Sequence, residues 1–549
     1  MSRIFIRLWP VAILCVAIVL SLPLLVISGS LWFPALEVWA HLASTVLSDY
    51  VINSLIVMVG VGIGTFILGV GPAWLTAMCC FPLHRIFEWA LLLPLSMPAY
   101  IIAYTYTGML DVAGPVQTAL RDGFGWRYGD YWFPDVRSLG GAVIMLTLVL
   151  YPYVYLLARA AFLEQSICVL EVSRTLGCSA WQSFVRVALP LARPAIIAGL
   201  SLALMESLAD YGTVQYFGVS TFTTGIFRTW FGLGEPAAAA QLSALLLLFV
   251  LTLIVLEQAS RKRARYHHTS HRYRPLPGYR LRGWPAIVAF SACFLPLLLG
   301  FLLPTGQLLH WTLSTAAQVL DRQFVLLALH SVSLALSAAL LALMLALVMA
   351  YGKRRYARPS VNLAVRFAGL GYALPGTVIA VGVMLPLAWI DNALDAWFEA
   401  HFGISTGLLL SGTLVALLFG YMVRFLAVSL GTVEAGLGKI RCNMDDAARS
   451  LGLNDMAILR WIHLPIMRGS LLTALLLVFV DVLKELPATL ILRPFNFNTL
   501  AVRTYELAND ERLIEAASSA LAIVLCGIVP VILLSRSISR SRPGHELRP

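Results

Sequence analysis

Charged residues stand inside two strongly apolar segments, and their chemistry is the first functional signal in the sequence. The segment MESLADYGTVQYFG carries Glu206 and Asp210, and the segment VDVLKELPATLILRP carries Asp481, Lys484 and Glu485. A charge within a membrane is costly and is therefore a functional candidate. In each segment two carboxylates are four positions apart, which predicts that they share one face of a helix.

Two roles are open for these carboxylates. If the two acidic pairs meet across a pseudo-twofold axis, they would form a negative ring suited to a cation and would line a translocation pathway. Alternatively, each carboxylate pairs with an Arg or Lys, such as Lys484, and holds helices together. Pro487 follows Glu485 and predicts an interrupted helix, where transporters often expose backbone to a cavity.

The two segments belong to a repeat that runs through the chain. An offset of 275 positions aligns Glu206 with Asp481 and Asp210 with Glu485. The same offset aligns three further residues of each half: Phe222, Thr224 and Arg228 with Phe497, Thr499 and Arg503. Because half of the 549 residues is close to this offset, the chain reads as one unit written twice.

Composition places the chain in a membrane. It is 59% hydrophobic and only 12% charged, and its mean hydropathy is +0.83. About twelve apolar runs are each long enough to cross the hydrocarbon core as a helix. We therefore expect an all-α polytopic membrane protein with about 12 transmembrane helices in two homologous six-helix halves, because only self-satisfied helices suit runs this apolar.

Charge sets the expected topology and boundaries. The net charge of +11 falls in particular loops, and with a cytoplasmic N-terminus roughly 30 of the 39 Lys and Arg lie on the cytoplasmic side, as the positive-inside rule expects. This argues against a nucleic-acid partner and predicts a multi-pass membrane protein with both termini cytoplasmic. The predicted division is a first half of about six helices at 1–257, a basic cytoplasmic linker at 258–283 and a second half at 284–549.

Helix positions follow from the apolar runs. The third helix is expected at about Phe87–Gly108 and contains Pro94 and Pro98. The expected starts of the second-half helices are about Trp284, Phe324, Val361, Ile404, Gly469 and Ile514.

Metal and cofactor signals are weak. The linker carries His267, His268 and His271, which invite a metal hypothesis but are also ordinary residues of a polar linker. The eight cysteines form neither a disulfide framework nor a C-x-x-C metal pattern. No cofactor and no metal site is assigned.

A second repeated stretch lies between membrane helices on the cytoplasmic side. It comprises Glu171–Pro190, EVSRTLGCSAWQSFVRVALP, and Asp446–Pro465, DAARSLGLNDMAILRWIHLP. Each copy predicts a short helix that ends at a left-handed glycine, Gly177 or Gly452. A second helix then begins, with Ser179 and Gln182 as a capping box in one copy and Asn454 as the N-cap in the other. We expect Pro190 and Pro465 to end this second helix.

A rigid amphipathic element that protrudes once per half suits docking onto two copies of a partner. A surface hairpin with no partner is the simpler alternative. The acidic residue, the glycine and the proline keep their spacing between two otherwise diverged halves, and this favours docking.

These stretches resemble the EAA loop of ABC importer permeases. In that family the loop forms coupling helices that fit grooves on two ATPase subunits, and the resemblance implies such a role for Glu171, Gly177, Pro190, Asp446, Gly452 and Pro465. The acidic position departs from the family pattern, with EVS and DAA in place of EAA.

The charged segments narrow the resemblance. LADYGTVQYFGVSTFTTGIFRTWFG and DVLKELPATLILRPFNFNTLAVRTYE resemble the fused, two-half permeases of ferric-iron ABC importers, nearly end to end in both halves. This likeness implies a location in the bacterial inner membrane, with a periplasmic iron-binding protein and two copies of an ABC ATPase as partners. As the mechanism we expect alternating access. Permeases for thiamine, polyamine or another small solute remain alternatives, because the motifs that separate them are less specific.

Two other classes compete with an importer. A proton-coupled secondary transporter would also use intramembrane carboxylates and repeats, but it would need no docking loops. An enzyme would need a catalytic motif, and neither H-E-x-x-H nor G-x-S-x-G occurs. The P-loop pattern is absent too, so we expect partner subunits to hydrolyse the ATP.

Overall fold

The computed structural model describes residues 2–32, 35–164, 177, 179–262, 279–319, 321–356 and 358–540. The described residues are almost entirely helical, and eleven helices are long and apolar enough to cross a membrane, or up to twelve if a bent pair counts as one span. The expected all-α polytopic fold is confirmed.

The chain forms two compact units, and each draws on both sequence halves. Unit 1 comprises Met1–His41, Ile226–Leu247 and Asp321–Arg503, and unit 2 comprises Leu42–Gly225, Leu248–Leu320 and Thr504–Pro549. The predicted division at 257 and 284 concerns the sequence repeat and stays a prediction.

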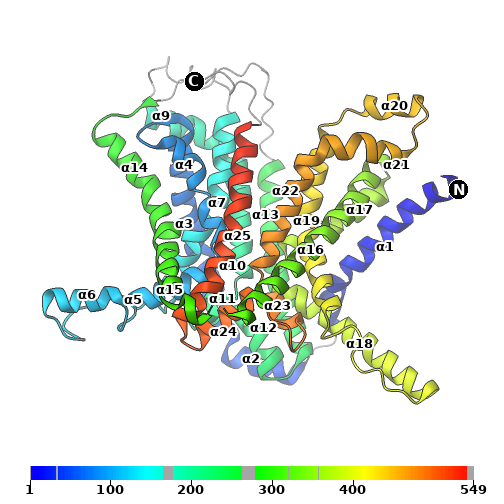
Figure 1. Cartoon of the computed structure of the whole chain (residues 1–549), viewed down its shortest axis with the longest axis horizontal. Coiled ribbons are helices and arrows are strands. Elements are labelled where there is room, and N and C mark those ends of the chain that lie inside the picture. Colours follow the sequence, from blue (N-terminus) through cyan, green and yellow to red (C-terminus); the bar gives the residue numbers. More distant parts are fainter. Residues whose placement is uncertain are drawn as a thin grey trace. The chain divides into compact units, whose positions relative to one another are not determined.

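Unit 1 is a bundle built around α16 and α19 (Figure 1). Its elements, including those that continue across the unit boundary, are α1 (Ser2–Gly29), η1 (Ser30–Trp32), α2 (Leu36–Thr45), η4 (Arg228–Gly232), α13 (Pro236–Lys262), α16 (Arg322–Arg355), α17 (Pro359–Ala368), η6 (Gly371–Ala373), α18 (Gly376–Phe402), α19 (Leu414–Gly438), α20 (Cys442–Ser450), α21 (Asp455–Ile458), η7 (Leu459–His463), α22 (Leu464–Leu483), α23 (Pro487–Leu492) and α24 (Leu500–Asn509).

Unit 2 is built around α3, α7 and α10. Its elements are α3 (Leu47–Met78), β1 (Cys79–Cys80), α4 (His84–Ala90), η2 (Leu93–Ser96), α5 (Ala99–Leu110), α6 (Pro115–Phe124), α7 (Leu139–Glu164), α9 (Ala180–Ser183), η3 (Phe184–Ala188), α10 (Leu189–Ala209), α11 (Gly212–Tyr216), α12 (Phe222–Phe227), β2 (Tyr279–Arg280), α14 (Trp284–Leu297), η5 (Leu298–Leu302), α15 (Leu303–Val319) and α25 (Leu513–Arg540). The two-residue strands β1 and β2 pair in parallel, with Cys79 opposite Tyr279.

Glycines bring α3 and α7 into close contact. A Cβ added at Gly60 would lie 2.7 Å from Val143, and one at Gly64 would lie 2.6 Å from Thr147. Small residues of this kind let helix backbones approach closely in membranes, where no hydrophobic effect drives helices together.

The first membrane helix of each sequence half packs against helices of the other half. In unit 1, the Trp9 indole on α1 donates to the Val348 carbonyl on α16 at 3.1 Å. In unit 2, the Tyr106 hydroxyl on α5 donates to the Leu299 carbonyl on η5 at 2.7 Å. Neither pairing was predicted, because the hydropathy of a helix does not encode which neighbour it contacts.

The predicted third helix at Phe87–Gly108 is wrong as one continuous helix. It is broken, and the segments His84–Ser96 and Ala99–Phe124 meet at 91°. Proline fixes φ and donates no hydrogen bond, and Pro98 has extended backbone (ψ 143°) as the N-cap of α5. Pro375 is likewise the N-cap of α18, with ψ 141°, so the helix expected from about Val361 is split into α17 and α18.

The expected helix start at Ile404 is also wrong. The helix, α19, begins at Leu414, after a loop that two carboxylates of α18 hold in place. Asp395 accepts from the Thr406 and Gly407 amides at 2.7 and 3.0 Å. Asp391 accepts from the Ser411 amide at 2.7 Å.

Candidate coupling elements and intramembrane carboxylates

The second-half element of the repeat forms the predicted helix–turn–helix at one end of unit 1, opposite the far end of α18 (Figure 1). Helix α20 ends in a Schellman turn, in which the Leu453 amide donates to the Ala448 carbonyl at 3.1 Å and the Gly452 amide to the Arg449 carbonyl at 2.9 Å. Gly452 has φ +86°, as predicted. The Asn454 side chain then accepts from the Ala457 amide at 2.8 Å and caps α21.

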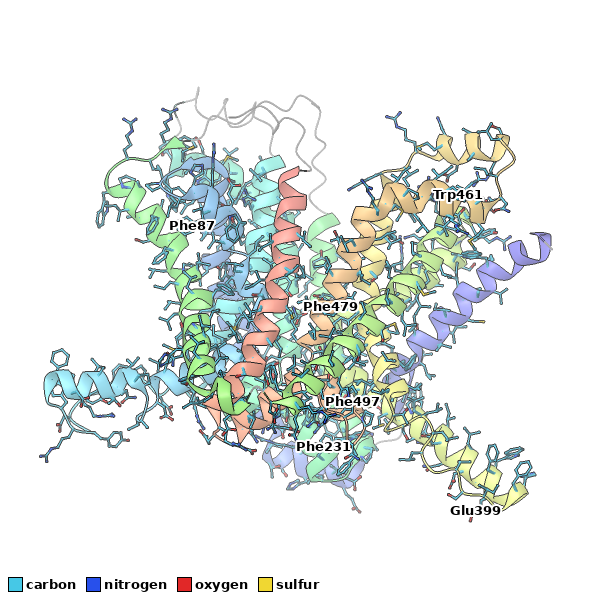
Figure 2. All side chains as sticks on the ribbon, viewed as in Figure 1. Phe87, Phe231, Glu399, Trp461, Phe479 and Phe497 are labelled. Carbon is cyan, nitrogen blue, oxygen red and sulfur yellow. The ribbon has the colours of Figure 1, made fainter. Side chains whose placement is uncertain are left out.

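The exposed side chains of this element lie on its outer surface. Asp446 is exposed and forms an ion pair with Arg449 at 2.9 Å. Trp461, labelled in Figure 2, is 68% exposed. A charged and aromatic surface on a rigid turn is suited to contact with another protein.

The described part of the first-half element has the same geometry. Gly177 has φ +80°. The predicted capping box is present, because the Ser179 amide donates to Gln182 Oε1 at 2.9 Å and the Gln182 amide donates to Ser179 Oγ at 3.3 Å. Glu171 lies outside the described residues.

Pro190 and Pro465 do not end the second helix, which corrects that prediction. The helical backbone continues over Trp181–Ala209 and over Asp455–Leu483. A π-helical turn, η3 or η7, precedes each proline. The Leu189 amide donates to Phe184, and the Leu464 amide donates to Leu459, in both cases five residues back. The wider turn accommodates a residue that has no amide hydrogen and whose ring would clash in a regular α-helix.

The intramembrane carboxylates do not share a helix face as predicted, because both helices end too early. α10 ends at Ala209, and Asp210 follows with extended backbone (ψ 133°). α22 ends at Leu483, and α23 begins at Pro487, which confirms the interruption predicted from that proline. Asp210 and Glu485 therefore lie in the break between two helices.

Asp210 and Glu485 cap the helices that follow them. The Asp210 carboxylate accepts from the amides of Thr213 and Val214, both at 3.1 Å, and from the Thr213 hydroxyl at 3.0 Å. Glu485 Oε1 accepts from the Ala488 amide at 3.1 Å. A carboxylate at a helix N-terminus satisfies amides that have no partner within the helix.

Glu485 and Asp481 also form ion pairs. Glu485 Oε1 lies 3.4 Å from Arg424 Nη1, and both side chains are buried. Asp481 Oδ1 lies 2.8 Å from Lys484 Nζ, and that pair is half-buried. The Glu485–Arg424 pair matches the alternative in which a carboxylate holds helices together, because Arg424 lies on α19. The Asp481–Lys484 pair lies within the end of α22. Glu206 is half-buried on α10.

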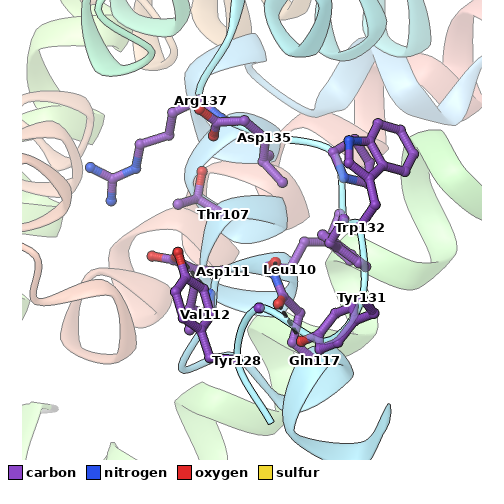
Figure 3. Close-up of a pocket in the computed structure, with 14 residues that line it drawn as sticks. Thr107, Leu110, Asp111, Val112, Gln117, Tyr128, Tyr131, Trp132, Asp135 and Arg137 are labelled. Carbon is purple, nitrogen blue, oxygen red and sulfur yellow. Dashed lines mark hydrogen bonds between the residues drawn. The ribbon is translucent and has the colours of Figure 1, made fainter. Parts of the chain in front are cut away.

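Sequence reasoning missed a cavity of about 510 Å³ in unit 2, between α5, α6 and the loop before α7 (Figure 3). Asp111, Tyr128 and Arg137 are among its lining residues. The Tyr131 hydroxyl donates to Gln117 Oε1 at 2.7 Å and ties the loop to α6. The sequence feature that could have predicted α6 is the amphipathic pattern of residues 115–124.

The described residues contain no group of three or more His, Cys, Asp or Glu able to hold a metal ion. His267, His268 and His271 of the linker lie outside the described residues.

Comparison with known proteins places these elements in a family. Residues 10–266 match the family described as binding-protein-dependent transport system inner membrane component. The Fe(3+)-transport system permease protein of Haemophilus influenzae is 26% identical over 494 residues, which cover 89% of this chain and 90% of that protein. The ferric transport system permease protein of Actinobacillus pleuropneumoniae is 23% identical over 459 residues, covering 80% of this chain and 64% of that protein.

A shorter relative matches one part of the chain. The molybdenum transport system permease protein of Escherichia coli is 29% identical over 172 residues, which cover 31% of this chain and 70% of that protein. The family match covers the first sequence half, and the Haemophilus relative extends the likeness across both. The chain is therefore a multi-pass membrane protein whose first half matches this family of inner-membrane transport components and whose two halves together are similar to permeases named for ferric iron.

Proposed function

We propose that this permease carries ferric iron from a periplasmic binding protein to the cytoplasm. Its partners in this proposal are that binding protein and two copies of an ABC ATPase, one docked on each coupling element. The partners hydrolyse the ATP, and both termini of this chain are cytoplasmic. The proposal of ferric iron as the substrate rests on the similarity, over most of this chain, to permeases named for ferric iron.

The proposed mechanism rests on the structure of the coupling elements. Both contain a left-handed glycine and continue without interruption into a membrane helix, through α10 in one half and α22 in the other. A displacement applied to either element by an ATPase would thus pass directly into the membrane. ATP binding closes the ATPases and opens the permease outward, and hydrolysis resets the inward-facing state.

We further propose separate roles for the four carboxylates. Glu206 and Asp210 remain candidates for lining the pathway. Asp481 and Glu485 act mainly through their ion pairs with Lys484 and Arg424.

Substrate uptake tests the proposal. Cells carrying this chain, its ATPase and its binding protein receive radiolabelled ferric iron, and matched cells receive thiamine, polyamine or molybdate. Iron uptake that requires ATP is expected, and Glu206→Ala should lower it while the complex still assembles. Uptake of another solute without iron would retain the importer and refute the substrate. Uptake driven by a proton gradient without the ATPase would refute the importer mechanism.

The two glycines test the coupling role. We expect Gly177→Val and Gly452→Val to abolish transport while membrane insertion stays intact. Normal uptake in both variants would contradict the docking mechanism.

A further inference from the structure

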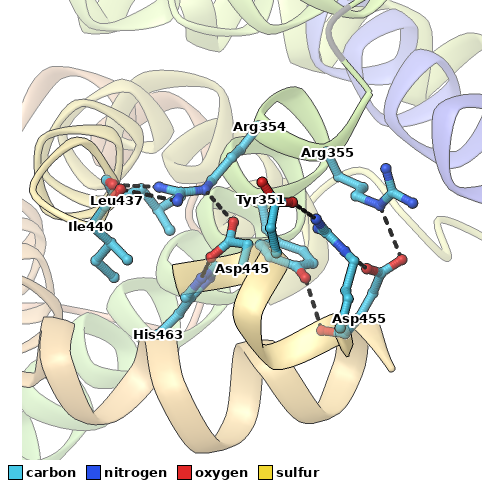
Figure 4. Close-up of polar contacts among 10 residues, drawn as sticks. Tyr351, Arg354, Arg355, Leu437, Ile440, Asp445, Asp455 and His463 are labelled. Atoms are coloured by element: carbon cyan, nitrogen blue, oxygen red, sulfur yellow. Dashed lines mark hydrogen bonds and ion pairs between the residues drawn. The ribbon is translucent and has the colours of Figure 1, made fainter. Parts of the chain in front are cut away.

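A buried acid joins the second coupling element to the membrane helices. Asp445 on α20 is only 6% exposed, although its neighbour Asp446 faces solvent. Its Oδ2 accepts from Arg354 Nε at 3.0 Å, and its Oδ1 lies 2.7 Å from His463 Nε2 (Figure 4). One carboxylate therefore connects α20 to the end of α16 and to the π-helical turn before α22.

Arg354 extends this network to a fourth helix. Its guanidinium also donates to the carbonyls of Leu437 and Ile440, at 2.6 and 3.0 Å, where α19 ends. A cation at this place satisfies carbonyls that have no partner within the helix and complements the helix dipole. We call Arg354, Asp445 and His463 the polar clamp.

Neighbouring residues attach α21 to the same end of α16. The Tyr351 hydroxyl donates to the Asp455 carbonyl at 2.8 Å, and Arg355 Nε donates to Asp455 Oδ2 at 3.1 Å. The side chains of Arg355 and Asp455 are 37% and 26% exposed, so that pair contributes less than the buried clamp.

Among the described residues of the first half, aromatic rings pack against the coupling element. Trp74 on α3 lies with its ring centroid 5.4 Å from Phe162 and 5.1 Å from Phe184. The 275-residue offset places Leu170 and Ala188 at the positions of Asp445 and His463. Neither side chain can form the pair that Asp445 and His463 form, so that pair belongs to the second half alone.

We infer that Asp445 is the positioning residue of the second coupling element, which it aligns with the membrane helices through Arg354 and His463. This inference rests on the proposed function, in which that element docks an ATPase. Charge-assisted hydrogen bonds are directional, whereas ring packing tolerates small shifts. Loss of the Asp445 charge would loosen the second docking site and leave the first intact.

The test compares transport with ATP hydrolysis in one sample. The complete complex is reconstituted in proteoliposomes with Asp445→Asn, with Arg354→Gln and with both changes. Glu399→Gln, exposed at the far end of α18 (Figure 2), is the matched charge control. We expect uptake per ATP hydrolysed to fall at least about tenfold in each single variant. In the double variant this ratio should fall no further than in the more impaired single variant, because both changes remove the same interaction.

A distance measurement separates positioning from simple stabilisation. Spin labels at Ala435 on α19 and Ser450 on α20, both exposed positions, report how firmly α20 is held. We expect a narrow distance distribution in the wild type and in Glu399→Gln, and a broad one in Asp445→Asn. If Asp445→Asn does not accumulate, His463→Gln removes one arm of the clamp and serves as the second variant.

Unchanged label distances and an unchanged uptake-to-hydrolysis ratio would overturn the inference. Equal losses of uptake and hydrolysis with a narrow distribution would also overturn it, because they indicate a role in stability alone. If the wild-type chain bound no ATPase, the proposed function would fail, while the label distances would still test the clamp.

Discussion

The buried pair of Arg424 and Glu485 allows a sharp prediction, because it separates a pathway carboxylate from a structural one. The two side chains are 7% and 5% exposed. Removing one partner of a buried ion pair typically costs about 3–5 kcal/mol, since the other charge stays buried without compensation. Glu485→Gln keeps the acceptor for the Ala488 amide and removes only the charge, so we expect a loss of about 3 kcal/mol.

Removing both charges should restore most of that loss. Replacing a buried pair with uncharged groups is often neutral or stabilising, so Arg424→Leu combined with Glu485→Gln should lie within about 1 kcal/mol of the wild type. Gly376→Ala should displace the two side chains while both charged residues are kept, because its Cβ would lie 2.3 Å from Arg424 Nη1 and 2.5 Å from Glu485 Oε1.

Unfolding in mixed detergent micelles measures these free energies, and iron uptake is measured on the same variants. The half-exposed pair of Lys353 and Glu434 supplies the control, since Glu434→Gln should change stability by less than about 1 kcal/mol. A double variant that is stable and transports normally would establish a structural role for Glu485. If Glu485→Gln alone is as stable as the wild type, the reasoning from the buried pair is refuted.

Three further predictions concern the coupling elements. Gly452→Asn should retain more transport than Gly452→Val. A Cβ at this position meets no described atom within 4 Å, so the two variants differ only in how well they tolerate the left-handed backbone, which Asn adopts more readily than Val. Equal uptake by the two variants would contradict this. Ser179→Ala should destabilise the start of α9 by about 1 kcal/mol, seen as faster amide exchange there than in the wild type. Burial alone would raise the pKa of Asp445, but hydrogen bonds from His463 and Arg354 and their charges lower it below 3.8. The contribution of the Asp445 carboxylate to stability is therefore fully present above pH 3.8 and is lost as the pH falls through its lower pKa in the folded protein. Spin-label distance distributions that already broaden between pH 7 and pH 5 would refute this.

Local features of the coupling elements could be predicted because each depends on a few adjacent residues. Gly452 takes the left-handed conformation, and Ser179 and Gln182 form their capping box, since caps and turns are encoded within about four positions. The same local reasoning failed at Pro190 and Pro465. A proline predicts a broken helix, but a π-helical turn one residue earlier removes the conflict.

Features that depend on distant residues were beyond this reasoning. The break after Ala209 follows from Asp210 capping a new helix, and spacing alone gave a shared helix face instead. In the sequence, Lys353, Arg354 and Arg355 count only toward the positive charge that sets the topology, because the partners Asp445 and Asp455 are about 100 positions away. Residues with a polar partner far along the sequence have no periodic signature.

The placement of α1 has a consequence for how the protein is made. α1 packs on α18, where a Cβ at Gly382 would lie 2.7 Å from the Pro23 carbonyl oxygen. The ribosome synthesises that partner more than 300 residues after α1, which at bacterial and eukaryotic elongation rates is a delay on the order of tens of seconds. Helix α1 thus enters the bilayer before these native neighbours exist, and an insertase or lipid must shield its surface until the second half of the chain emerges.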